Sequence, residues 1–335
     1  MNMTELRKTL CVSELTKDGK LPILFMPNEI FNDIRDNVNG TSQFVASIYC
    51  CYYLDVLLYR YAIYGNNHET LKIPTYKEIL GYPRNSRVID PIIKKDGLLN
   101  LMGYTRPESN YPIGWSLTKE NDPIYELEFA LLKDRRIDED GKDHGYYLPD
   151  MIMKAVANRV KIHYPIKAFV RQHTDTNGEK SELGTFYSIS HTHGIELETF
   201  LKCMSDPELG VEGFYLYALI KSKSDYFQEY WNVKFDDLIK MSGLKPTKFK
   251  EVLLTLREYR MIDVENMPWV IDRPSHISTK SNGYKANDYS QFKSFKQPVA
   301  KPIKTSWERC MRDYPDAILS QLSPDELDGI ELQLP

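Results

Sequence analysis

The chain has 335 residues, 42% hydrophobic and 27% charged, which is the composition of an ordinary globular protein long enough for two domains. A formal net charge of -4 argues against a surface that is basic throughout, so any contact with nucleic acid must come from local clusters of lysine and arginine. Five cysteines without a C-x-x-C pair argue against a disulfide framework or a thiolate zinc site. With no secretory signal pattern at the first residues, we expect a cytoplasmic protein.

The segment 44–64 is almost wholly apolar and long enough to span a bilayer. Asp55 and Arg60 lie in its middle, where a charged side chain is costly. We therefore predict a buried core helix and no membrane contact.

Two segments of the chain, 22–116 and 185–272, pass through the same order of signals, which indicates an internal repeat. Each begins with a short apolar run, followed by a short helix and then by the longest apolar-periodic helix of its segment. The apolar runs are 22–26 and 185–189, and the long helices are 42–64 and 211–223.

In the first segment, Thr75 and Glu78 have the spacing of a capping box that would begin a helix at Tyr76, after a β-like run. Pro91 interrupts the following helical stretch, because an interior proline costs about 3 kcal/mol, and we expect a shorter helix that begins at Pro91 with Asp90 as its cap. Strands at 98–105 and 111–116 are then expected to form a hairpin.

In the second segment, a helix at 237–241 ends at Gly243, and a new helix begins at Pro246, where proline suits the first helical turn. Strands at 261–265 and 269–271 are expected to pair as a hairpin. The predicted buried stripe of the helix is Phe249, Val252, Leu253, Leu256 and Tyr259.

Helix, strand, helix, turn, helix and hairpin is the order of a winged helix. The stretch 214–264, which contains FDDLIKMSGLKPTKFKEVLLTLREYRMIDV, resembles the winged-helix modules of the DnaD and plasmid RepA N-terminal families of low-GC Gram-positive bacteria. Counting both segments, the resemblance covers about half the chain. It implies a mainly α fold with small β wings, built from tandem winged helix-turn-helix units.

The same resemblance implies sequence-specific binding of double-stranded DNA, in a plasmid or phage replication initiator that binds origin repeats. The first segment, where Pro91 disturbs the pattern, either reads DNA or serves as a packing or dimerisation copy. The candidate DNA-binding residues are Lys245, Thr247, Lys248, Lys250 and Arg257 in the second segment, and Arg84, Asn85, Arg87 and Lys94 in the first.

Two other functions remain open: a transcriptional regulator of the same mobile element, and a protein-interaction scaffold that does not bind DNA. The chain contains neither G-x-x-x-x-G-K-[ST] nor G-x-G-x-x-G, and no Ser-His-Asp or Cys-His arrangement can be argued, so we expect no enzyme and no cofactor. His191 and His193 alternate without a recognisable third ligand, and we interpret them as ordinary polar residues rather than a metal pair.

The expected domains are a first winged-helix unit at 20–120, a connector at 121–183, a second unit at 184–272 and a tail at 273–335. The connector contains an acidic solvated loop at 134–144 and a helix at 149–163. Within the tail, 280–304 mixes aromatic and basic residues, which suits either single-stranded nucleic acid or a linker packed on the second unit. The acidic end is either frayed or a docking peptide for replisome or helicase-loading proteins. The sequence also leaves open whether the protein forms a homodimer.

Overall fold

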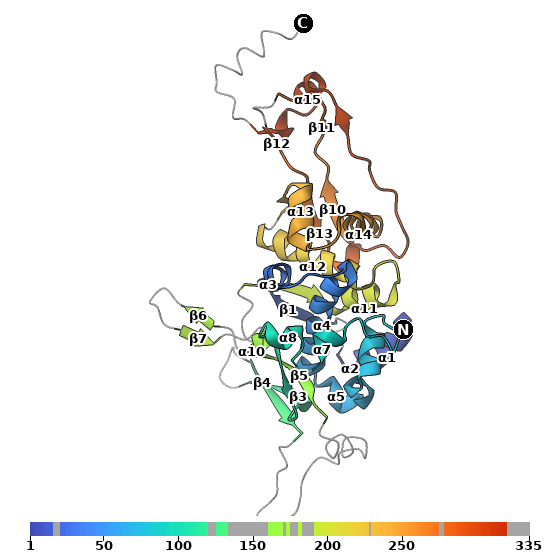
Figure 1. Cartoon of the computed structure of the whole chain (residues 1–335), viewed down its shortest axis with the longest axis vertical. Helices are drawn as coiled ribbons and strands as arrows, with labels where there is room; N and C mark the ends of the chain where they lie inside the picture. The colour runs from blue at the N-terminus through green and yellow to red at the C-terminus, as the bar shows by residue number, and fades with distance from the viewer. Residues whose placement is uncertain are drawn as a thin grey trace, which may run out of the picture.

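The computed structural model describes residues 1–15, 21–94, 96–119, 125–132, 160–169, 172–174, 180–182, 191–227, 229–274 and 278–319. This part of the chain is mainly helical, with sheets of only two or three strands (Figure 1). The expected class, mainly α with small β elements, is confirmed at this level. The expected acidic loop at 134–144, the expected strand at 185–189 and residues 320–335 of the acidic end of the tail lie outside the described residues.

The two repeated segments meet through corresponding elements. Strands β1 and β8 pair antiparallel, with Phe25 opposite Gly194, and helices α4 and α12 pack against each other. Antiparallel pairing of corresponding strands is the arrangement that an approximate two-fold axis between the segments produces. The first set is β1 (Ile23–Pro27), α3 (Ile30–Asn37) and α4 (Ser42–Arg60), and the second is β8 (Thr192–Glu196), α11 (Leu197–Ser205) and α12 (Gly210–Phe227).

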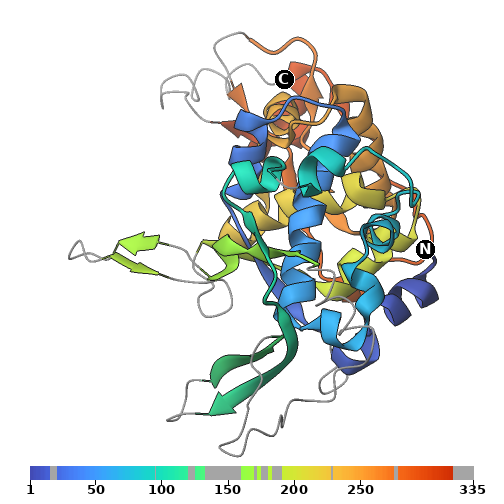
Figure 2. The same ribbon diagram turned by 60° about the horizontal axis from the view of Figure 1, so that its bottom comes forward.

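Helix α4 forms the centre of the core, and Figure 2 shows it in blue, running through the middle of the molecule. Every residue from Val45 to Tyr59 is buried, because both segments cover it. Tyr53 places its ring 4.9 Å from the rings of Phe200 and Phe214 of the second segment. The prediction of a buried core helix is therefore confirmed. Within the described part of the chain, every helix is too short or too polar to traverse a bilayer.

The core is continuous across both repeats. One cluster of buried side chains extends from Leu6 to Ala286. The predicted units 20–120 and 184–272 thus share their hydrophobic interior.

The first segment departs from its sequence prediction after α4. Ala62 takes a left-handed conformation with φ of 48° and ends the long helix before α5 (Ile63–Asn66) and η1 (His68–Leu71). Helix α6 (Ile73–Ile79) begins earlier than expected, with Pro74 in its first turn. The capping box of Thr75 with Glu78 was wrong, because proline's fixed φ starts the helix before Thr75, which is buried inside it.

The stretch around Pro91 forms two short helices, α7 (Asp90–Ile93) and α8 (Leu98–Leu101), separated by Asp96 with φ of 61°. A short helix with Pro91 in its first turn was expected, but Asp90 lies in the helix rather than capping it. The predicted hairpin of 98–105 with 111–116 was wrong, because residues 98–101 are helical and the strands that do form pair with other segments of the chain. Strand β2 (Thr105–Glu108) pairs with β5 (Ile162–Pro165), and β3 (Pro112–Lys119) pairs with β4 (Tyr125–Leu131).

Strand β5 contains Ile162 and His163, where the sequence predicts the end of a connector helix. These two residues are extended because they pair with β2. Residues 149–159 of that helix lie outside the described residues.

In the second segment, the helices expected at 237–241 and from Pro246 form as α13 (Phe235–Ser242) and α14 (Pro246–Glu258), whereas the β-like run expected at 233–236 does not form a strand. Gly243, with φ of 64°, ends α13, and Pro246 lies in the first turn of α14. The five apolar residues of the predicted stripe are all buried. The elements are β9 (Trp231–Asn232), α13 (Phe235–Ser242), α14 (Pro246–Glu258), β10 (Ile262–Glu265) and β13 (Gly283–Ala286).

These strands form an antiparallel sheet in the order β10-β13-β9. The predicted hairpin of 261–265 with 269–271 was wrong, because β10 pairs with β13, beyond a long connection. Strand β13 was expected to be part of a linker, and it is instead the middle strand of this sheet.

The connection between β10 and β13 is braced by the C-terminal part of the chain, at the top of Figure 1. Within the connection, β11 (Trp269–Val270) pairs with β14 (Lys304–Thr305). Likewise, β12 (Ser278–Thr279) pairs with β15 (Ile318–Leu319). Helix α15 (Trp307–Asp313) lies between β14 and β15 in the sequence. The remaining elements are α1 (Met3–Thr9), α2 (Val12–Leu15), α10 (Ile166–Phe169), β6 (Gln172–Thr174), β7 (Lys180–Glu182), η2 (Tyr289–Gln291) and η3 (Pro315–Ala317).

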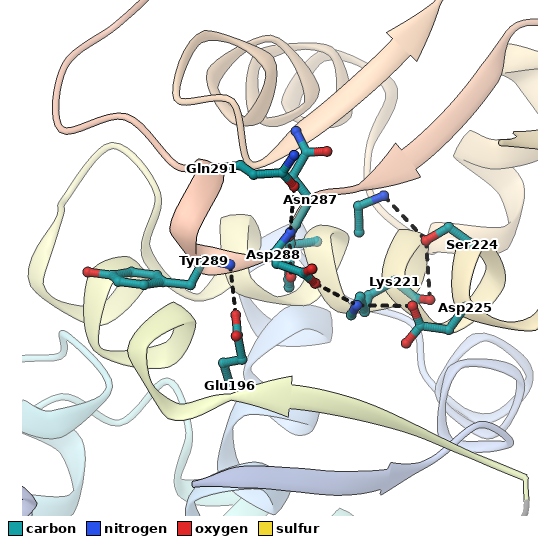
Figure 3. A network of polar contacts seen from close by, with 10 residues as sticks. Glu196, Lys221, Ser224, Asp225, Asn287, Asp288, Tyr289 and Gln291 are labelled. Carbon is teal, nitrogen blue, oxygen red and sulfur yellow. Dashed lines mark hydrogen bonds and ion pairs between the residues drawn. The ribbon is translucent and has the colours of Figure 1, made fainter. Parts of the chain in front are cut away.

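A network of polar contacts holds β13 and the residues after it on the second segment (Figure 3). Lys221 of α12 lies 3.0 Å from Asp225 and 3.3 Å from Asp288. The backbone N–H of Tyr289 donates to Glu196 at 2.7 Å. These contacts favour the packed-linker interpretation of 280–304 over a free single-strand-binding segment.

Candidate nucleic-acid interface

The start of α14 is open to solvent. Lys245 is its N-cap residue but provides no side-chain cap, and Lys245, Pro246 and Thr247 are all exposed. The first backbone N–H groups of a helix have no partner within it, and the helix dipole adds partial positive charge there. An uncapped and exposed helix start of this kind suits an anion such as a phosphate group.

The start of α4 lies beside the start of α14. The backbone N–H of Lys245 donates to Ser42 Oγ at 2.9 Å, which joins the two repeats at this point. A wide, shallow hollow is lined by both helix starts, including Thr41, Gln43 and Thr247. The two helix dipoles therefore place their positive ends at one surface.

Two lysines in the first turns of α14 are accessible to solvent, and of these Lys248 lines the hollow. Lys248 has a side chain that is 42% exposed and lies 3.8 Å from the carboxylate of Glu251. Lys250 is exposed, with its ammonium 6.0 Å from the ring centre of Phe235. Neither lysine is covered by another part of the described chain. An exposed ion pair such as Lys248 with Glu251 contributes little, so a phosphate can replace the carboxylate at small cost.

Arg257 lies apart from the other candidates of the second segment. It is twelve positions beyond Lys245, which corresponds to about 18 Å along a helix. Its guanidinium donates to the carbonyl oxygen of Ala300 at 3.2 Å, and burial lowers its pKa. The structure thus gives Arg257 a second role, the attachment of the C-terminal segment.

The candidates of the first segment occupy the turn after α6 and the end of α7. Arg84, Asn85 and Arg87 are exposed, and Arg84 pairs with Glu78 at 2.9 Å. Lys94 is 64% exposed and lies 2.9 Å from Asp90.

Asp90 also pairs at 2.6 Å with Lys77, which is buried. Hydrogen bonds from Lys77 and then Lys94 lower the pKa of the Asp90 carboxyl, so it stays ionised at neutral pH. This carboxylate ties α7 to α6 and holds the turn between them.

The two sets of candidates meet along one helix. Tyr82, in the turn after α6, lies 2.5 Å from Ser47 of α4, hydroxyl to hydroxyl. Ser42, which contacts Lys245, is five positions earlier on the same helix, or about 7.5 Å along its axis. The N-terminal part of α4 therefore supports both candidate surfaces.

The contribution of α4 was not found from the sequence. Thr41 could be recognised as a helix cap, and its side chain does accept from the N–H of Phe44 at 3.2 Å. The position of this helix start beside Lys245 depends on a contact between residues 203 positions apart, which no local pattern reports.

His193, one of the two alternating histidines, is buried between two partners. Its ring nitrogens lie 2.8 Å from Tyr49 Oη and 2.8 Å from Asn28 Oδ1. Burial lowers its pKa to about 3, so the ring is neutral and serves as a polar link inside the core.

No protein-family model, curated protein or solved structure matches this chain. Neither the fold nor the function of this chain can therefore be assigned from a relative.

Proposed function

We propose that this chain is a sequence-specific double-stranded DNA-binding protein. The second segment is then a winged helix-turn-helix unit, in which α13 and α14 are the helix pair and the long connection between β10 and β13 is the wing. The element order and the sheet order β10-β13-β9 support this assignment. Such a unit inserts its second helix in the major groove and places its wing on the DNA backbone.

The observation that carries the proposal is the exposed, uncapped start of α14 with Lys248 and Lys250 beside it. Phosphate contacts from such lysines and from backbone N–H groups fix the position of a protein on DNA. Thr247 and Lys250 then lie within reach of base edges. The local basic character also accounts for DNA binding by a chain whose net charge is negative.

The first segment adds a second contact to the same DNA. Arg84, Asn85 and Arg87 lie on a turn attached to α4, close to where α14 is attached. The antiparallel pairing of β1 with β8 relates the two segments approximately by a two-fold axis, which favours a bipartite target.

As its biological role we propose replication initiation at the origin repeats of a plasmid or phage, as the family resemblance implies, with helicase-loading or replisome proteins as partners. Control of transcription of the same element would use the same surface. The position of the bound site separates the two roles: a footprint on direct repeats of an origin supports an initiator, and a footprint over a promoter supports a regulator.

The direct test is selection of bound duplexes from a random-sequence pool, followed by affinity measurement on the enriched sequence. The double variant Lys248→Ala, Lys250→Ala should bind more weakly. Its plot of log K against log salt should become shallower by about 1.8, because each lost phosphate contact removes about 0.9. Lys8→Ala is the control, since Lys8 is equally charged and exposed but lies on α1.

A failure to enrich any duplex would refute DNA binding and leave the scaffold function. Enrichment with no change in the double variant would place the interface elsewhere on the protein. An equal loss in Lys8→Ala would mean that binding depends on total charge rather than on α14.

A further inference from the structure

Two large apolar side chains face solvent in the long connection between β10 and β13. Trp269 is 65% exposed and Ile271 is 63% exposed, whereas Val270 between them is buried. Side chains alternate between the two faces of a strand, so Trp269 and Ile271 point to the same, solvent-facing side of β11. Tryptophan is mostly buried in folded proteins, and neighbouring exposed apolar side chains mark binding surfaces.

The strand beside β11 adds a cation to the same face. Strand β14 pairs parallel with β11 and places Lys304 opposite Trp269. The backbone N–H of Ile271 donates to the carbonyl oxygen of Thr305 at 3.1 Å, which continues the pairing past β11. Lys304 is exposed, and its ammonium lies 5.3 Å from the centre of the Trp269 ring. We call Trp269, Ile271 and Lys304 the wing platform; it lies near the top of Figure 1, by the label β11.

The chain around the wing platform is basic. Residues 269–274 and 299–306 contain three basic side chains and one acid. The basic residues are Arg273, Lys301 and Lys304. All three are exposed, and none forms an ion pair with any described residue. The acid, Asp272, accepts the backbone N–H of Trp307 at 2.6 Å, at the start of α15. The charge of this surface therefore suits an anionic partner.

An exposed indole among basic side chains is the arrangement that binds single-stranded nucleic acid. Each unpaired base offers a flat face to the ring, and each phosphate offers a charge to a lysine or arginine. A duplex keeps its base faces stacked on one another, so it presents only base edges and backbone to the ring. An uncharged apolar partner would gain nothing from the unpaired cations.

We propose that the wing platform binds single-stranded DNA, with a base stacked on the Trp269 ring and phosphates beside Lys304, Lys301 and Arg273. The inference rests on the proposed function, because it adds an unpaired strand to the DNA that the winged unit contacts. Packing of 280–304 on the second segment leaves Lys304 exposed beside the ring. A protein that holds a duplex through α14 and an unpaired strand through the wing platform would stabilise DNA opened beside its site.

The test measures binding of a fluorescently labelled oligothymidylate of about twelve nucleotides to the full chain by anisotropy. Trp269→Ala should lower the affinity about tenfold, the effect of one lost stack of a base on an aromatic ring. Trp269→Phe should keep most of the affinity, because a phenyl ring also stacks. Tyr226→Ala is the matched control: this aromatic residue is 77% exposed but lies on α12, so its loss should leave the affinity unchanged.

Two further readouts separate stacking from charge. Binding should quench the fluorescence of Trp269, and Trp269→Phe should lose this quench although it still binds. Lys304→Ala should make the plot of log K against log salt shallower by about 0.7, the value for one phosphate contact on a single strand. Lys8→Ala, which removes an equally exposed charge on α1, should leave the slope unchanged.

The proposal is overturned if the oligothymidylate does not bind, as expected if the wing platform docks a protein partner instead, or if Trp269→Ala binds it as tightly as the wild type. It is also overturned if Trp269→Ala weakens binding of the enriched duplex as much as binding of the single strand, because the ring would then be a duplex contact. Thermal unfolding shows whether each variant is folded. If Trp269→Ala is not, the wild type and Trp269→Phe still decide: a quench in the wild type alone supports stacking, and its absence contradicts it.

The two proposals fail separately. Absence of oligothymidylate binding leaves duplex binding through Lys248 and Lys250 standing. Failure to enrich any duplex leaves the effect of Trp269→Ala on the single strand unchanged.

Discussion

Replacing Phe214 by alanine tests whether the two repeated segments unfold as one unit. Phe214 of α12 is fully buried, with its ring 4.9 Å from that of Tyr53 in α4 and 5.2 Å from that of Phe200 in α11. Truncation of a core phenylalanine to alanine costs about 3–5 kcal/mol, and the lost ring pairs place this site near about 4 kcal/mol. With a urea m-value of about 3 kcal/mol/M, the midpoint should fall by about 1.3 M.

Native-state hydrogen exchange is the more specific assay, because it reports each helix separately. Peptides from α6, in the first segment, and from α14, in the second, should lose the same free energy of opening in Phe214→Ala. Tyr226→Ala is the control, since this aromatic residue of α12 is 77% exposed and its loss should change stability by less than about 0.5 kcal/mol. Two separate urea transitions, with only one shifted by Phe214→Ala, would refute a shared core.

Two further predictions concern pH and packing. Burial lowers the pKa of His163 to about 4 and that of His193 to about 3 in the folded protein. Between pH 4.5 and 6 both rings therefore bind a proton in the unfolded chain and are neutral in the folded one. Buried Asp55, whose pKa burial raises, keeps a proton in the folded protein that the unfolded chain releases. Together the three groups make the free energy of unfolding rise by about 1.4 kcal/mol per pH unit, because the unfolded chain binds one more proton than the folded one. Asp55→Asn should steepen this slope by about 1.4 kcal/mol per pH unit, measured by urea unfolding at several pH values. An unchanged slope would contradict the protonated, buried Asp55. Gly65→Ala should cost about 3 kcal/mol in the same assay, because its Cβ would lie 1.9 Å from the carbonyl oxygen of Ile113, while Gly81→Ala, with open space but φ of +79°, should cost about 1 kcal/mol. Equal costs would exclude that clash.

Local signals predicted helices α13 and α14 of the second segment well. The left-handed Gly243 and the first-turn Pro246 are properties of single residues, and the buried stripe from Phe249 to Tyr259 follows from the helical period. The same kind of reasoning failed at Thr75, because its neighbour Pro74 started the helix first. Local rules therefore succeed where no competing local signal is present.

Strand pairing could not be predicted from either segment alone. Strand β10 was predicted almost within its observed bounds, whereas β2 shares only Thr105 with the predicted strand 98–105. Their partners β13 and β5 lie beyond intervening segments of the chain. Hydrophobic alternation defines which face of a strand is buried and does not identify the strand beside it. The expected tight hairpins were therefore wrong in both segments.

For the candidate interface too, some features follow from the sequence and others only from the tertiary structure. Lys248 and Lys250 could be chosen from the sequence, because the helical period leaves them outside the apolar stripe. That Ser42 accepts from Lys245, and that Lys304 lies beside Trp269, could not be predicted. The sequence by itself determined the long helices, the end of α13, the start of α14 and the apolar face of α14, because these depend on residues within a few positions of one another. Only the tertiary structure decided which helix starts meet and which strands pair, because both result from packing between residues far apart in the chain.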